Sequence, residues 1–175
     1  MKRIFALVCI CLVSASLAIA GSPEKKAAAG AAPDVDAMKT EMMSCKICKA
    51  MVPNMATFGP VMTSEVVKMD NGMAMVHHIS DPKVVPTFQK VCDEMSAAGK
   101  SCTTMSEAEW KAALCDHCEG IMTLVQSGAV IGTGHTKDGS MLVLTSSDPA
   151  VQTKIANFEM QCEKMMAAMP ESKGM

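Results

Sequence analysis

Two pairs of short segments along the chain are rich in apolar and β-branched residues, and a turn sequence divides each pair. Residues 61–69 and 73–79 flank Asp70-Asn71-Gly72, and residues 129–137 and 141–145 flank Asp138-Gly139. Asn-Gly or Asp-Gly between two β-rich segments is typical of a tight antiparallel turn. The pattern therefore predicts two β-hairpins.

Apolar residues at helical spacing precede and follow the first hairpin. We expect one helix over about 35–52 and a second over about 82–98, which Gly99 ends. Each of these helices would present one apolar face to the sheet.

The second hairpin has the same neighbours. Ser106 and Glu109 form a capping box that begins a helix, and Gly128 is placed to end it. Asp148-Pro149 then supplies the cap and the first residue of a last helix that continues to about Met169. The order helix–strand–strand–helix therefore occurs twice.

Cysteines mark the two copies at the same positions. Cys45-x-x-Cys48 recurs seventy residues later as Cys115-x-x-Cys118, and Cys92 recurs as Cys162. A fixed period with matching turns and cysteines indicates an internal duplication. We predict an α+β fold in which two hairpins form one antiparallel sheet with the helices packed on one face. Residues 34–99 would form repeat 1, 100–105 a connector and 106–170 repeat 2, both within one domain.

The first 20 residues resemble a signal peptide. Lys2 and Arg3 precede an apolar stretch too short to span a membrane, and Ala18-Ile19-Ala20 fits a cleavage site. Residues 21–33 are rich in Ala, Lys, Pro and Gly, which predicts a flexible linker. We expect an exported protein, periplasmic or secreted.

The charge of the processed chain argues against nucleic acid as a partner. Without Lys2 and Arg3 the chain has 14 basic and 18 acidic residues, a net charge of −4, and only 3% of the full sequence is aromatic. No spacing typical of a hydrolase, a phosphate loop or covalent haem attachment is present. Chemistry is therefore expected to depend on sulfur.

The cysteine spacing predicts two metal sites. On a helix, residues three apart share a face, so each CxxC presents two sulfurs together, and the cysteine of the closing helix can add a third. Thiolate and thioether ligands suit copper(I) first and zinc second, and the chain has 19 methionines. The first site would draw on Cys45, Cys48, Cys92, His77, His78 and Met51, and the second on Cys115, Cys118, Cys162, His117 and Met122.

Two other interpretations of the cysteines stay open. In an oxidising compartment Cys48–Cys92 and Cys118–Cys162 can be disulfides that staple a binding module without metal. Alternatively, the CxxC motifs, above all Cys115-Asp116-His117-Cys118, can serve a thiol–disulfide oxidoreductase. Seven cysteines remain after processing, an odd number, and Cys102 belongs to neither copy, so it is the candidate for a disulfide-linked dimer.

Part of each repeat resembles a known family. Cys45-x-x-Cys48-x-x-Met51-Val52, a hairpin around Asn71-Gly72, and Asp81 before a helix resemble the accessory proteins of nitrous oxide reductase (NosL type). The resemblance implies an exported, non-enzymatic copper protein that delivers or sequesters metal, with a periplasmic metalloprotein as recipient. It implies Cys45, Cys48 and Met51 as ligands, and Cys115, Cys118 and Met122 in the second copy.

Overall fold

The computed structural model describes the backbone of residues 35–168 and the side chains of residues 39–167. The predicted leader and linker lie outside this range. The described residues form helices and a single sheet, so the predicted α+β class is confirmed.

The sheet has four antiparallel strands in the order β1-β2-β4-β3. The first hairpin consists of β1 (Met62–Met69) and β2 (Gly72–Ile79), and the second of β3 (Val130–His135) and β4 (Gly139–Thr145). Both predicted hairpins and the joint sheet are therefore confirmed. The inner strands β2 and β4 belong to different repeats, and their pairing joins the two halves.

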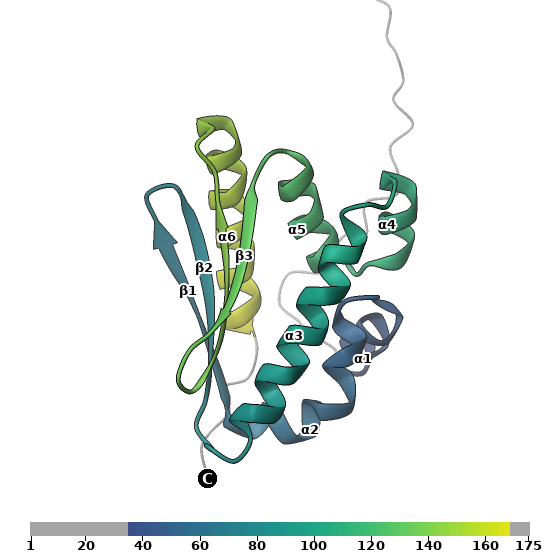
Figure 1. The fold of residues 1–175 in the computed structure, drawn as a ribbon, viewed down its shortest axis with the longest axis vertical. Coiled ribbons are helices and arrows are strands. Elements are labelled where there is room, and N and C mark those ends of the chain that lie inside the picture. The colour runs from purple at the N-terminus through teal and green to yellow at the C-terminus, as the bar shows by residue number, and fades with distance from the viewer. Residues whose placement is uncertain (1–34, 169–175) are drawn as a thin grey trace, which may run out of the picture. The chain divides into compact units, whose positions relative to one another are not determined.

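The closing helices of both repeats lie on the same face of the sheet (Figure 1). They are α3 (Val85–Cys102) and α6 (Pro149–Ala168). Helix α3 contacts β4 of the other repeat, and α6 contacts β1 and β2 of the other repeat and, less extensively, β4 of its own. Each closing helix therefore packs mainly against the hairpin of the opposite repeat, an exchange that the repeat pattern alone does not specify.

The opening helix of repeat 1 is shorter than predicted. Helix α1 ends at Ser44 (Val35–Ser44), and short 3-10 turns η1 (Cys48–Ala50), η2 (Val52–Asn54) and η3 (Gly59–Val61) surround α2 (Met55–Phe58). The first CxxC therefore lies in a tight turn rather than inside a helix.

The opening segment of repeat 2 is also divided. Helix α4 (Glu107–Ala113) begins at the predicted capping box, and α5 (Asp116–Gln126) begins after Leu114 and Cys115 adopt extended backbone angles. Gly128, at φ 103°, follows the end of α5 as predicted. Gly99 does not end α3, which extends into the predicted connector (100–105) as far as Cys102.

Two apolar clusters fill the space between the sheet and the helices. The larger one joins α5 and α6 to β2 and β4, and contains Met73, Leu124, Ala129, Leu144, Val151, Ile155, Phe158 and Cys162. The other joins α2 and α3 to the end of β2, and contains Phe58, Ile79, Val85, Phe88 and Val91. Each cluster contains one of the two closing helices, and the larger one includes buried residues from both repeats.

Glycine is required at two equivalent positions in the central strand pair. A Cβ built on Gly72 would overlap the carbonyl oxygen of Leu144, and one built on Gly139 would overlap that of His77. We expect Gly139→Ala to lower the free energy of unfolding by about 1–3 kcal/mol, because backbone atoms must separate. Urea denaturation measures this change. Gly132→Ala on β3 meets no atom within 4 Å and serves as the control; an equal loss in both variants would contradict the close approach.

Candidate metal centre

The first dithiol occupies the turn that follows α1. The backbone N–H of Cys45 donates to the carbonyl of Glu41 in the last turn of that helix. The N–H of Cys48 then donates to Cys45 Sγ at 3.4 Å. This local turn holds both sulfurs on one side of the chain.

The second dithiol lies at the N-terminus of α5. Cys115 is the N-cap residue and Cys118 is the third residue of the helix. The positive end of a helix dipole favours a thiolate at this position. The sequence predicted one continuous helix with this motif about two turns inside it. That expectation was wrong, because the helix is interrupted at Leu114 and Cys115.

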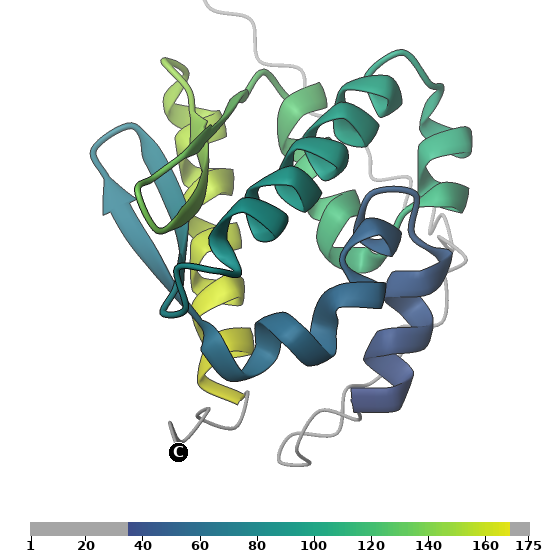
Figure 2. The same cartoon turned by 60° about the horizontal axis from the view of Figure 1, so that its bottom comes forward.

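Two hydrogen bonds hold the dithiols of the two repeats against each other. The backbone N–H of Lys46 donates to the carbonyl of Ala113 at 2.8 Å. Glu41 Oε1 accepts from the backbone N–H of Asp116 at 3.1 Å, so α1 supplies a cap for α5. Figure 2 shows the segment after α1 beside the start of α5.

The result is one cluster of four thiols. The Sγ atoms of Cys45, Cys48, Cys115 and Cys118 all lie within 4.8 Å of one another. Cys48 Sγ lies 3.3 Å from Cys118 Sγ and 3.7 Å from Cys115 Sγ. A tetrahedral ion with bonds of about 2.3 Å to sulfur separates its ligands by roughly 3.8 Å. The spacing therefore fits a single ion bound by four thiolates.

The cluster is enclosed by protein. The four cysteines are between 1% and 8% exposed. The apolar residues that pack against them are Met42, Ile47, Met95 and Leu114. Burial excludes competing water from the sulfurs and strengthens their electrostatic interactions.

Hydrogen bonds among the clustered thiols favour a thiolate at Cys115 over one at Cys48 or Cys118. Hydrogen bonds from Cys118 and then from Cys48 hold the pKa of Cys115 well below its ordinary value. Donation to the same Cys115 thiolate raises the pKa of both Cys48 and Cys118. A bound cation would favour further deprotonation inside this buried cluster, because each added negative charge repels the first.

The third cysteines do not join the dithiols, so the two predicted three-thiol pockets do not form among the described residues. Burial raises the pKa of the Cys92 thiol, and a hydrogen bond with Ser140 on β4 offsets part of that rise. Cys162 packs with Met73 of β2 and the rest of the larger apolar cluster. Both cysteines therefore lie among residues of the closing helices and the sheet, away from the dithiols.

The histidines named as ligands also lie outside the four-thiol cluster. His77 Nδ1 is 2.7 Å from Ser64 Oγ, and its ring meets that of Phe88 edge-on. His78 lies on the other face of the sheet, as strand alternation predicts, near Glu65 and Asp138. The ring of His117 packs against that of Phe158, with centroids 5.3 Å apart.

The two methionines named as ligands belong to apolar clusters. Met51 packs against the cluster of Phe58 and Phe88, and Met122 packs with Cys102 and Trp110. The structure instead brings Met42 and Met95 to the four thiols. The sequence did not distinguish these two from the other methionines.

Cys102 is inaccessible in the folded chain. It lies in the last turn of α3 with 0% of its surface exposed, rather than in a polar connector. A disulfide-linked dimer through Cys102 would require this part of the fold to open. The seven cysteines of the described residues are all free thiols, so neither predicted intra-repeat disulfide is present.

The structure also brings together a serine, a histidine and an aspartate that the sequence did not connect. His135 Nδ1 lies 3.0 Å from Ser140 Oγ, and its Nε2 lies 3.1 Å from Asp93 Oδ1. Ser140 is only 4% exposed, so a substrate has no access to its hydroxyl. The three residues fasten α3 to the second hairpin.

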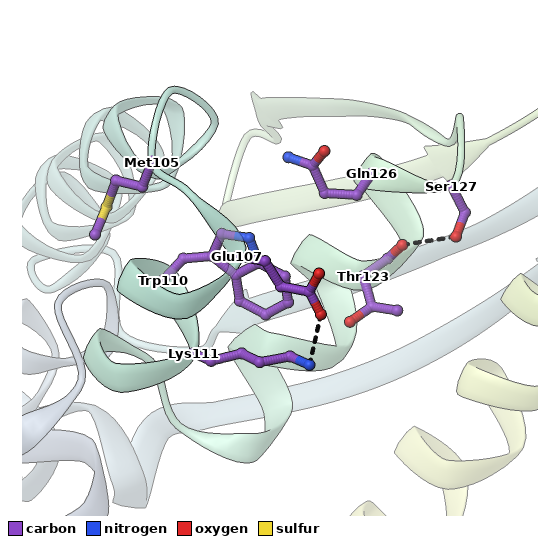
Figure 3. Close-up of a pocket in the computed structure, with 7 residues that line it drawn as sticks. All are labelled: Met105, Glu107, Trp110, Lys111, Thr123, Gln126 and Ser127. Carbon is purple, nitrogen blue, oxygen red and sulfur yellow. Dashed lines mark hydrogen bonds and ion pairs between the residues drawn. The ribbon is translucent and has the colours of Figure 1, made fainter.

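A shallow pocket of about 290 Å³ lies between α4 and α5 (Figure 3). Its residues include Trp110, Thr123 and the ion pair of Lys111 with Glu107, whose charged atoms are 2.7 Å apart. None of the four clustered cysteines lines it. The candidate metal centre is therefore separate from this pocket.

Acidification is expected to destabilise the fold through His77. Burial lowers the pKa of His77 below its ordinary value of about 6.5, so the unfolded chain binds a proton that the folded chain resists. The contribution of neutral His77 to the free energy of unfolding is therefore fully present above about pH 6.5. It is lost as the pH drops toward the folded-state pKa. Urea denaturation of the reduced, metal-free protein at several pH values measures this loss, and His77→Gln should diminish it.

His78→Gln provides the control for this measurement. The hydrogen bond to Glu65 raises the pKa of His78, so its contribution to stability is present at low pH and is lost as the pH rises. His78→Gln should therefore make the free energy of unfolding fall more steeply as the pH is lowered. Equal pH profiles for both variants would contradict the assignment.

Comparisons with known proteins identify no relative. No family model, curated protein or solved structure matches this chain. No helix within residues 35–168 combines the length and apolar character needed to cross a membrane.

Proposed function

We propose that this protein binds one thiophilic metal ion through Cys45, Cys48, Cys115 and Cys118. The observation that supports this proposal is the convergence of four buried sulfurs from two repeats at the spacing of a tetrahedral site. Both dithiols contribute, so one ion completes the contact between the repeats.

Zinc(II) is favoured over copper(I). Four thiolates in a tetrahedral arrangement are a preferred environment for zinc, whereas the copper(I) expectation came from two separate sites rich in sulfur. Copper(I) is the alternative, because the thioether residues Met42 and Met95 pack against the thiols.

The role proposed for the ion is sequestration in an exported protein. A ligand set that is at most 8% exposed exchanges its ion slowly unless the fold opens. This suits retention better than delivery to a periplasmic metalloprotein. Export is supported by the leader-like residues 1–20, and the copper(I) alternative by the resemblance to NosL-type proteins.

Native mass spectrometry of the reduced chain tests the proposal. Titration with zinc(II), and separately with copper(I), is expected to give one bound ion per chain, with zinc retained against a competing chelator. Iodoacetamide should then leave four thiols unmodified at the cluster. Two ions per chain, or none with either metal, would reject the single-site proposal.

A further inference from the structure

Cys48 occupies a particular place within the cluster. Its Sγ is 3.3 Å from Cys118 and 3.7 Å from Cys115, so it contacts both sulfurs of the other repeat. The residues in the shorter contact are seventy positions apart in the sequence. A disulfide bond is about 2.04 Å long, so this pair must approach by only about 1.3 Å.

We propose that the metal-free protein forms a disulfide between Cys48 and Cys118, and that this bond and the metal exclude each other. The inference rests on the proposed function, since it makes occupancy of the same site depend on oxidation. A disulfide consumes two of the four thiolates, and the two that remain cannot complete a tetrahedral site.

Exposure sets the order of the exchange steps. Within the proposed pair, Cys48 is 8% exposed and Cys118 is 3% exposed, so an external disulfide reaches Cys48 before Cys118. Cys48 gives up its proton as its sulfur attacks a low-molecular-weight disulfide, which forms a mixed disulfide and releases one thiolate. The Cys118 thiolate then attacks Cys48 Sγ and releases the second one. Two protein thiols are oxidised, one external disulfide is reduced to two thiols, and the two protons pass to the released thiolates.

The geometry favours Cys118 over Cys115 as the partner of Cys48 in the other repeat. Cys45 Sγ accepts the backbone N–H of Cys48, and that contact fixes it beside the turn. Cys115 lies farther from Cys48 than Cys118 does. The proposed bond therefore joins the two repeats.

Disulfide mapping of the full chain tests the inference. The reduced, metal-free protein is treated with oxidised glutathione, and the remaining thiols are blocked with iodoacetamide. Trypsin cleavage after Lys46 separates Cys45 from Cys48, and Asp-N cleavage before Asp116 separates Cys115 from Cys118. The expected main product joins peptide 47–49 to peptide 116–137.

The same treatment of the zinc-loaded protein should proceed at least tenfold more slowly and release one zinc ion per disulfide formed. Cys92→Ser should form the same product, because Cys92 lies outside the cluster. Bonds within the CxxC motifs as the main products, no disulfide at all, or equal rates with and without zinc would overturn the inference.

The outcomes separate this inference from the proposed function. If the reduced protein binds one zinc ion but forms other disulfides, the proposed function stands and only the Cys48–Cys118 bond is rejected. If the protein forms the Cys48–Cys118 bond but binds no metal, the proposed function is rejected.

Discussion

Cys118→Ala is expected to abolish metal binding rather than halve it, because the four thiols form one site. The variant should also lose the stabilisation that the ion gives the wild-type fold. That stabilisation is about 4 kcal/mol when the free metal concentration is 1,000 times the dissociation constant. Native mass spectrometry measures the stoichiometry, and thermal unfolding with and without zinc measures the stabilisation.

Cys162→Ala is the matched control for this prediction. Cys162 is also buried, but it lies in the apolar cluster between α6 and the sheet. Its removal should leave one bound ion and the shift in melting temperature on zinc addition unchanged. Binding lost in Cys162→Ala, or half retained in Cys118→Ala, would support two separate three-thiol pockets instead.

The second large effect is expected from Phe88→Ala on α3. Phe88 is fully buried, and its ring meets that of Phe58 edge-on with centroids 5.2 Å apart. Removal of a buried phenyl ring costs about 3–5 kcal/mol, because apolar contacts are lost and a cavity remains. Urea denaturation should show this loss in the free energy of unfolding.

Met160→Ala provides the comparison, since Met160 lies on α6 with 49% of its surface exposed. Its effect should stay within about 0.5 kcal/mol. A loss below about 1 kcal/mol in Phe88→Ala would contradict the packing of α3 against α2 and the sheet.

Local sequence signals predicted both hairpins and the start of α4 correctly. Asp70-Asn71 and Asp138-Gly139 located both hairpins, and Ser106 with Glu109 located the start of α4. These signals act over a few residues, so the sequence contains them directly. The break at Leu114 and Cys115 was missed because apolar spacing continues across it.

The arrangement of the thiols depends on contacts between distant residues. The spacing identified both dithiols, but nothing in either repeat shows that the closing helices exchange partners across the sheet. In the fold, Cys92 lies beside Ser140, Cys162 lies in the apolar cluster under the sheet, and the two dithiols meet each other. The duplicated cysteines therefore predicted two separate metal sites, whereas the fold brings the two dithiols into one cluster.

X-ray absorption spectroscopy of the zinc-loaded protein tests the central claim most directly. One zinc ion per chain with four sulfur ligands at about 2.3 Å is the predicted result. A coordination shell of three or fewer sulfurs completed by nitrogen or oxygen would contradict a centre made from both dithiols.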